Sequence, residues 1–386
     1  MTTQAVTDDT PSPSGGVIEK DAQGKLTGLV AETAALPFIA SATKFSLAQG
    51  LKIVNSAVKE YSSMGVTSVQ NGAADKKGFN TLRYASKFNL VPMRIQVWPY
   101  YKTLGPAYLS GELDAEKVKT DKFEVNTFKI VADGSIQGYT GFLTEPYFVL
   151  PNDAQGQPKE NYVGYPTLDR EKLTDLVTKA YKKGLHVAIH GNGDAAIDNI
   201  IYAVEQAQKK YPQSDARTIL IHAQMARNDQ LDSMKALGIT PSFFSAHTYY
   251  WGDRHVSTFM GPERAASMSP AQSAKQKGLR FSIHLDTPVV PINPMLMVWN
   301  AVNRESTSGQ IIGSQERISV IQALRATTID AAWQTFKDQD LGSIEAGKFA
   351  DLVVLAQDPL TVEASQLKDI KVLETFVGGV SIYKSK

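Results

Sequence analysis

Cysteine is absent from the 386-residue sequence. Its absence excludes a disulfide framework, a thiolate nucleophile and a zinc site with sulfur ligands. A metal ion in this protein would therefore need imidazole, carboxylate or modified side chains as ligands. The sequence contains only six histidines, so these are the first residues to search for a site.

An excess of charge of either sign is also absent. Forty basic and 39 acidic side chains leave a formal net charge of +1, so no global field favours nucleic acid or an anionic membrane. No apolar run approaches the length of a membrane span, and residues 1–16 are polar rather than signal-like. These features favour a small-molecule substrate as partner, allow a homodimer and leave the cytoplasm as the default location.

Nucleotide-binding fingerprints are missing too, because no GxGxxG or GxxxxGK(S/T) motif opens a helical pattern. From residue 44 onward, amphipathic helical patterns instead alternate with short apolar strands. We count seven such strands: VTSVQ, MRIQVW, VNTFKIVAD, LHVAIH, TILIH, GITPSFF and LRFSIHLD. This alternation predicts a parallel sheet with helices outside it, either doubly wound or closed into a barrel. The missing fingerprints make a doubly wound oxidoreductase the least favoured alternative.

The sequence pattern divides the chain into three parts. Residues 1–40 begin with a polar leader, followed by a hairpin-like element with a turn at Gln23–Gly24. Residues 41–336 carry the helix–strand alternation, and its last helix is predicted over 318–336. Residues 337–386 change to short strands separated by Gly, Asp and Pro. We therefore expect one large α/β domain with a small β appendage.

Four chemically suitable residues lie at the ends of predicted strands. LHVAIH ends at His190, TILIH at His222 and FSIHLD at Asp286, and Lys129 ends the strand before His190. His190 and His222 are 32 residues apart, and His222 and Asp286 are 64 apart, which corresponds to one and two strand–helix units. Active sites form at the carboxyl ends of barrel strands. Each residue alone fits a structural role, but together two imidazoles and a carboxylate suit zinc or a similar divalent ion.

Further polar side chains are expected at the same carboxyl ends of the strands. The segment HTYYWGDRH follows the strand GITPSFF and is predicted to offer substrate contacts on a loop. Its candidates are His247, Tyr250, Trp251, Asp253 and Arg254. Alternatively, its aromatic rings only pack a lid and Asp253 pairs with Arg254 or a neighbour. His284 lies two residues before Asp286, hence on the same strand face, and is a further candidate for substrate binding.

Several longer motifs resemble a known family. They are GVIEKDAQGKLTGLVAE, FKIVADGSIQ, HVAIHGNGDAAID, LIHAQM, HTYYWGDRH with GPERA, SIHLDTPVVPINPM, AVNR, ALRATTIDAAW and GSIEAGKFADLVVLAQDP. Together they resemble the amidohydrolase superfamily, and within it the amidohydrolase-3 or YtcJ-like metal-dependent hydrolases, over nearly the whole chain. The resemblance implies a TIM-like (β/α)8 barrel beside a β-sandwich. It also implies hydrolysis of an amide or other non-peptide C–N bond by metal-activated water.

The resemblance assigns roles by position. Lys129 matches the lysine of barrel strand 4, which in such enzymes is often carboxylated so that its carbamate binds metal. His190 and His222 match the metal ligands of strands 5 and 6, and Asp286 matches the catalytic general base of strand 8. One or two ions of zinc or another divalent metal are then expected as cofactors.

One departure from the family pattern concerns the first barrel strand. In the family this strand ends in a His-x-His pair, and no such pair occurs in this sequence. We therefore expect strand 1 to be missing from the barrel and the β-sandwich to be partial. An alternative function follows, in which the chain is a catalytically impaired fragment or a non-catalytic homologue that needs a partner segment for strand 1.

Overall fold

The fold is described from a computed structural model over residues 6–42 and 45–386. Residues 1–5 of the predicted leader and residues 43–44 lie outside the described residues. The strands are β1 Gly16–Lys20, β2 Leu26–Glu32, β3 Ser68–Ala74, β4 Arg94–Pro99, β5 Phe123–Val125, β6 Thr127–Val131, β7 His186–Gly191, β8 Thr218–His222, β9 Ile239–Phe243, β10 Ser282–Ile283, β11 Leu352–Leu355, β12 Val372–Val377 and β13 Val380–Lys384.

The α-helices surround these strands. They are α1 Leu36–Ala42, α2 Leu47–Ser63, α3 Lys76–Lys87, α4 Gly105–Ser110, α5 Ala115–Val118, α6 Arg170–Lys182, α7 Asp194–Lys210, α8 Asn228–Leu237, α9 Ala246–Arg254, α10 Gly261–Ala266, α11 Ala271–Gln276, α12 Pro294–Asn303, α13 Val320–Thr327 and α14 Ile329–Gln334. Shorter turns are η1 Ile136–Gly138, the π-helical η2 His255–Phe259, η3 Ser314–Glu316 and η4 Ala364–Asp369. None of the described helices combines the length and the apolar character that a membrane span requires.

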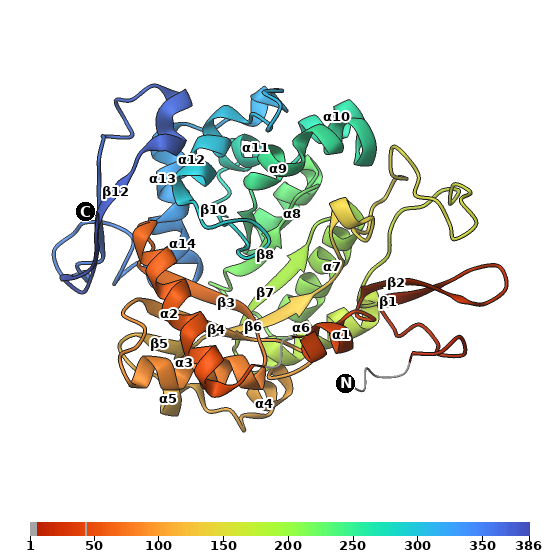
Figure 1. The fold of residues 1–386 in the computed structure, drawn as a ribbon, viewed down its shortest axis with the longest axis horizontal. Coiled ribbons are helices and arrows are strands. Elements are labelled where there is room, and N and C mark those ends of the chain that lie inside the picture. Colours follow the sequence, from red (N-terminus) through yellow and green to blue (C-terminus); the bar gives the residue numbers. More distant parts are fainter. Residues whose placement is uncertain (1–5, 43–44) are drawn as a thin grey trace.

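Two parallel sheets form the centre of the molecule. The larger has the order β10-β9-β8-β7-β6, and the smaller has the order β3-β4-β5. They adjoin at β4 and β6, where the backbone N–H of Tyr101 donates to the carbonyl oxygen of Lys129 at 2.9 Å. In Figure 1, β6, β7 and β8 run through the middle of the ribbon with α7 and α8 alongside. The predicted mixed α/β fold with parallel sheets is confirmed.

The unit α6–β7–α7 shows how local sequence produces this architecture. The carboxylate of Asp169 caps α6 by accepting from the N–H of Lys172 at 2.8 Å. Gly184 ends the helix with a left-handed φ of 65°, which glycine adopts without strain. At the other end of β7, a Cβ on Gly193 would lie 1.9 Å from the carbonyl oxygen of Phe142, so only glycine fits there. These local features therefore place β7 between α6 and α7, which pack closely together.

The outer edges of the two sheets are open. Within the described ranges β10 pairs only with β9, and β3 pairs only with β4. β10 is also short, with two residues against five in β9. One edge of β10 and one edge of β3 therefore have no hydrogen-bonded strand beside them in the part of the chain that is described.

Two antiparallel β elements lie outside the parallel sheets. β1 and β2 form a hairpin, and β11, β12 and β13 form a three-stranded sheet in the C-terminal part. Figure 1 places the hairpin and β12 at opposite ends of the long axis. The hydroxyl of Thr375 in β12 donates to the carbonyl oxygen of Ser62 at 2.7 Å, which fastens the C-terminal sheet to α2.

Two predicted segments differ from the structure. The helix expected over 318–336 is divided into α13 and α14, because Thr328 has a non-helical backbone (φ −127°, ψ −96°). The segment HTYYWGDRH is helical over α9 rather than a loop. His247 and Trp251 lie four residues apart in this helix, so their rings meet on one helix face, with centroids 6.0 Å apart and planes tilted by 59°.

Candidate active site

Three histidine rings form a continuous row at the carboxyl ends of the central strands. His190 is the next-to-last residue of β7, His222 ends β8, and His284 follows β10. Nδ1 of His190 lies 3.2 Å from Nε2 of His222, and Nδ1 of His222 lies 3.1 Å from Nε2 of His284. The structure thus brings two predicted metal ligands and one predicted substrate contact into direct contact. We call His190, His222 and His284 the histidine row.

Lys129 lies beside this row on β6. Its side chain is buried, with 6% of the residue exposed. Burial lowers the pKa of Lys129 to about 7, while the negative charge of Asp286 acts in the opposite direction. A buried amine with this pKa is uncharged in about half of the molecules near neutral pH, and therefore repels a cation less than an ordinary lysine would.

Burial also keeps the histidine row uncharged. It lowers the pKa of His190 and of His284 to about 4, and it holds the pKa of His222 well below its usual range. The positive charges of neighbouring rings and of Lys129 act in the same direction on His222. Neutral imidazole is the form that binds metal ions, because its unprotonated nitrogen offers a lone pair.

Two of the predicted site residues have an unusual backbone. His222 has a φ of 73° and Asp286 a φ of 55°, both in the left-handed region. Ile219 and Ile221 of β8 pack in one cluster, so strand alternation would turn His222 to the opposite face. The left-handed backbone breaks that alternation and lets the His222 ring join the row. Asp286 lies beyond β10 with its side chain exposed to solvent.

Asp133 is a site residue that the sequence analysis missed. Its carboxylate is fully buried and accepts from the backbone N–H groups of Asn192, Gly193 and Phe142 at 2.8–3.0 Å. One carboxylate oxygen lies 3.6 Å from Nε2 of His190. Burial raises the pKa of Asp133 to about 7. The only sequence cue for Asp133 was its position in the VADGS motif, just after a predicted strand. This cue is weak, because an aspartate after a strand is usually a turn residue.

The predicted substrate contacts in α9 separate into two groups. His247 is buried with its ring centroid 5.8 Å from that of His222, and Trp251 packs against His247. Asp253 instead accepts from the hydroxyls of Ser306 and Ser308 at 2.6 and 2.8 Å rather than pairing with Arg254, which is exposed. Tyr250 contacts Tyr249 and Trp251. The structure therefore places His247 and Trp251 near the row, and Asp253 and Arg254 elsewhere.

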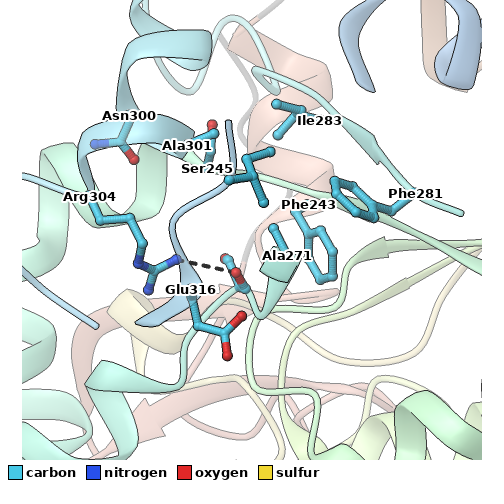
Figure 2. A pocket seen from close by; sticks show the side chains of 11 residues that line it. Phe243, Ser245, Ala271, Phe281, Ile283, Asn300, Ala301, Arg304 and Glu316 are labelled. Atoms are coloured by element: carbon cyan, nitrogen blue, oxygen red, sulfur yellow. Dashed lines mark hydrogen bonds between the residues drawn. The ribbon is translucent and has the colours of Figure 1, made fainter. Parts of the chain in front are cut away.

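Two cavities lie apart from the histidine row. The smaller, between β9, β10, α11 and α12, has a volume of about 10 Å³, room for no more than a water molecule. Figure 2 shows Asn300, Arg304 and Glu316 around it. The larger, of about 380 Å³, lies by the amino end of α7 and the loop after β8. Neither lining includes a predicted metal, catalytic or substrate-binding residue.

The side chains of the row meet one requirement of a metal centre. Two nitrogens bound to one tetrahedral zinc at about 2.0–2.1 Å are separated by roughly 3.3 Å, and His190 Nδ1 and His222 Nε2 are 3.2 Å apart. In the described part of the chain, no group of three His, Asp or Glu side chains is arranged to hold a metal ion. Lys129 is the third ligand that the family resemblance implies, and its amine is buried with a lowered pKa, which would suit carboxylation.

Comparison with known proteins settles the family. The sequence profile of the amidohydrolase family matches residues 3–383, which is nearly the whole chain. The chain belongs to the amidohydrolase family. The family resemblance predicted from the sequence motifs is thereby confirmed.

This amidohydrolase has relatives among curated proteins. It is 29% identical to the N-substituted formamide deformylase of Arthrobacter pascens over 383 residues, which cover 97% of this chain and 68% of that protein. It is 27% identical to the putative amidohydrolase YtcJ of Bacillus subtilis (strain 168) over 388 residues, covering 97% of this chain and 69% of the relative. The chain thus spans about two thirds of the length of these relatives.

Solved structures share the fold of this amidohydrolase. An uncharacterized metal-dependent hydrolase from Pyrococcus horikoshii OT3 superposes with a TM-score of 0.72 at 22% identity, covering 92% of this chain and 68% of that one. A second from Pyrococcus furiosus gives 0.70 at 23% identity, with coverages of 91% and 68%. At these identities the likeness establishes a common architecture.

Proposed function

We propose that this amidohydrolase cleaves amide or other non-peptide C–N bonds with a divalent metal ion, zinc or a similar metal, held by His190, His222 and Lys129. The observation that carries the proposal is the facing pair of imidazole nitrogens, 3.2 Å apart, beside the buried amine of Lys129. The similarity to an N-substituted formamide deformylase supports a C–N bond as the one that is broken.

The proposed division of work follows from the position of each side chain. A bound divalent ion would supply the activation of water, by lowering the pKa of that water toward about 7. Asp286 is exposed beside Lys129, so its carboxylate can accept a proton from the attacking water and return it to the leaving nitrogen. The carbonyl oxygen of Gly134 lies 3.2 Å from Nε2 of His190 and can accept from it, which would orient the ring. His247 and Trp251 offer a wall for substrate.

We also propose that the two parallel sheets are parts of one TIM-like barrel that lacks strand 1, and that β11–β13 are part of a β-sandwich. The open edges of β10 and β3 support this arrangement, because a strand between them would pair with both. The same edges support the second candidate function, in which the isolated chain is catalytically impaired and needs a partner segment for strand 1.

Carboxylation of Lys129 is predicted to depend on pH. Only the uncharged amine reacts with carbon dioxide, and burial lowers the pKa of Lys129 to about 7. The carbamate should therefore increase as the pH rises from about 6 to about 8, whereas a lysine with the ordinary pKa near 10.4 would stay protonated over that range. The measurement is the ¹³C NMR carbamate signal at constant dissolved ¹³CO₂. Lys129→Met should abolish the signal, and a signal that persists in this variant would place the modification elsewhere.

Metal binding by the unaided chain is predicted to be weak and incomplete, because three ligands remain and the sheet edge beside Asp286 is open. Elemental analysis should find at most about one divalent ion per chain. His222→Ala should remove it, whereas His186→Gln should retain it. His186 belongs to the same strand as His190 but bonds to Thr127 and to the carbonyl of Arg217.

The same samples test the reaction. Turnover on a panel of N-formyl and N-acyl substrates should disappear with a chelator and return with added metal. Turnover that survives complete metal removal would contradict the proposed function. Tight binding of two ions per chain would instead contradict the proposal that metal binding is weak without strand 1.

A further inference from the structure

The hairpin β1–β2 reaches the candidate active site through Glu32, the last residue of β2. Glu32 has a left-handed backbone with a φ of 52°, which residues other than glycine seldom adopt. Its carboxylate oxygen Oε1 accepts from the hydroxyl of Thr140 at 2.5 Å, although the two residues are 108 positions apart in the sequence. The sequence analysis assigned Glu32 no role. The N-terminal hairpin therefore contacts the loop that follows β6.

A second contact holds the same hairpin beside the end of β6. A Cβ added to Gly15, just before β1, would lie 2.3 Å from the carbonyl oxygen of Thr167. The hydroxyl of Thr167 donates to the carbonyl oxygen of Val131, the last residue of β6, at 2.7 Å. Its backbone N–H donates to the carbonyl oxygen of Ala132 at 2.8 Å. The hairpin is therefore held at two points around the segment that leaves β6.

Thr140 belongs to a tight turn that begins at Gly134. The backbone N–H of Gly134 donates to the carbonyl oxygen of Thr140 at 3.1 Å, and the N–H of Ser135 donates to the Thr140 hydroxyl oxygen at 3.0 Å. An ionised carboxylate can only accept, so the hydroxyl proton of Thr140 points to Glu32, and the hydroxyl oxygen accepts from Ser135. The carboxylate thereby fixes the hydroxyl that closes the turn.

Gly134 connects this turn to His190. A Cβ at position 134 would lie 2.2 Å from Oε1 of Glu32 and 2.1 Å from Oγ1 of Thr140, so the carboxylate rests directly against the backbone. The carbonyl oxygen of Gly134 lies 3.2 Å from Nε2 of His190 and accepts from Nδ2 of Asn192 at 2.8 Å. Gly134 thus contacts Glu32 on one side and the His190 ring on the other.

We infer that Glu32 is a positioning residue for His190, acting through Thr140 and the backbone of Gly134. The Gly134 carbonyl holds the imidazole ring in one orientation only while the turn itself is fixed. Without the carboxylate, the Thr140 hydroxyl can rotate toward the carbonyl oxygen of Ser135, which lies 3.4 Å away, and the turn loses its anchor to the hairpin. The consequence for metal binding rests on the proposed metal site, whereas the consequence for the ring does not.

The test replaces Glu32 by alanine and measures the turn, the ring and the metal separately. Amide hydrogen exchange at Ser135 should become faster, because its N–H loses a fixed acceptor. In metal-free protein labelled with ¹⁵N-histidine, the ring resonances of His190 should shift. The affinity for zinc should fall by about 10-fold, the lower end of the range for groups that orient a metal-binding imidazole. Glu32→Gln keeps an acceptor oxygen and should return all three quantities toward the wild-type values.

Two further variants separate positioning from a general loss of stability. Glu19→Ala removes a carboxylate from the same hairpin, where it accepts from Thr27 at 2.9 Å and pairs with Lys159 at 3.8 Å, and it should leave all three measurements unchanged. Thr140→Val removes the hydroxyl and should reproduce the effects of Glu32→Ala. The double variant of Glu32 and Thr140 should add little to either, because both changes break one hydrogen bond.

The outcomes that decide the inference are distinct from those that decide the proposed function. Unchanged His190 resonances in Glu32→Ala would overturn the positioning role, as would additive losses in the double variant or unchanged zinc affinity in a chain that binds zinc. If the wild-type chain binds no zinc, the proposed metal site fails, and the resonances of the metal-free protein still decide the role of Glu32. If Glu32→Ala does not fold, Thr140→Val decides it by the same measurements.

Discussion

Supplying a strand that pairs with the open edges of β10 and β3 is expected to raise the turnover of this chain by about 100-fold or more. Asp286 lies only three residues past β10, a strand of two residues that is held on one side by β9. A reacting group displaced by about 1 Å can lose on the order of 100-fold in rate. A second neighbour for β10 would fix the carboxylate relative to the histidine row.

The experiment adds the part of the Arthrobacter pascens relative that this chain does not cover, either fused to it or as a separate polypeptide. Chelator-sensitive turnover is then measured on the N-formyl and N-acyl panel. The family resemblance implies a His-x-His pair in this segment, and a version with such a pair changed to alanine separates strand pairing from ligand supply. Equal turnover with and without the segment would show that the open edge does not limit catalysis. The alternative that the isolated chain is catalytically impaired would then be abandoned.

Replacing Asp286 by asparagine is expected to reduce kcat by about 100- to 10,000-fold, the range found for general acid–base groups. The amide keeps the shape of the side chain but cannot take a proton from water. Metal content should not change, because the proposed ligands are Lys129, His190 and His222. Steady-state kinetics and elemental analysis on the same preparation therefore separate loss of the base from loss of the metal.

Asp169→Asn provides a matched control for this substitution. Asp169 caps α6, and asparagine caps helices about as well as aspartate, so folding and kcat should both stay at the wild-type level. If Asp286→Asn retains wild-type kcat while the metal is present, another group takes the proton, and the role given to Asp286 is wrong.

Much of the central architecture could be predicted because it depends on local periodicity. The apolar positions that repeat along α6 and the apolar residues 187–189 at the centre of β7 can be recognised without any partner segment. The same reasoning failed for α9, where polar and aromatic residues obscure the helical spacing of His247 and Trp251. It also missed the break at Thr328, which has no glycine or proline to mark it.

The site itself was predictable only in part. Strand ends and their spacing pointed to Lys129, His190 and His222, because parallel strands place their carboxyl ends together. The contact between His222 and His284 depends on the left-handed backbone at position 222, and strand alternation predicts the wrong face there. Asp133 depends on three backbone N–H groups from two distant segments, and no local pattern contains that information.

The left-handed backbone of His222 has a thermodynamic consequence. A residue other than glycine in this region costs on the order of 1–3 kcal/mol, and Asp286 adds a second such cost. Glycine at position 222 would relieve the backbone cost, but it would also remove a buried ring that packs against its neighbours, which are His190, Phe244, His247 and His284. Histidine retained at position 222 in a related sequence, despite the backbone cost, would therefore indicate that the proposed metal site is retained. Glycine there would indicate that the site has been lost.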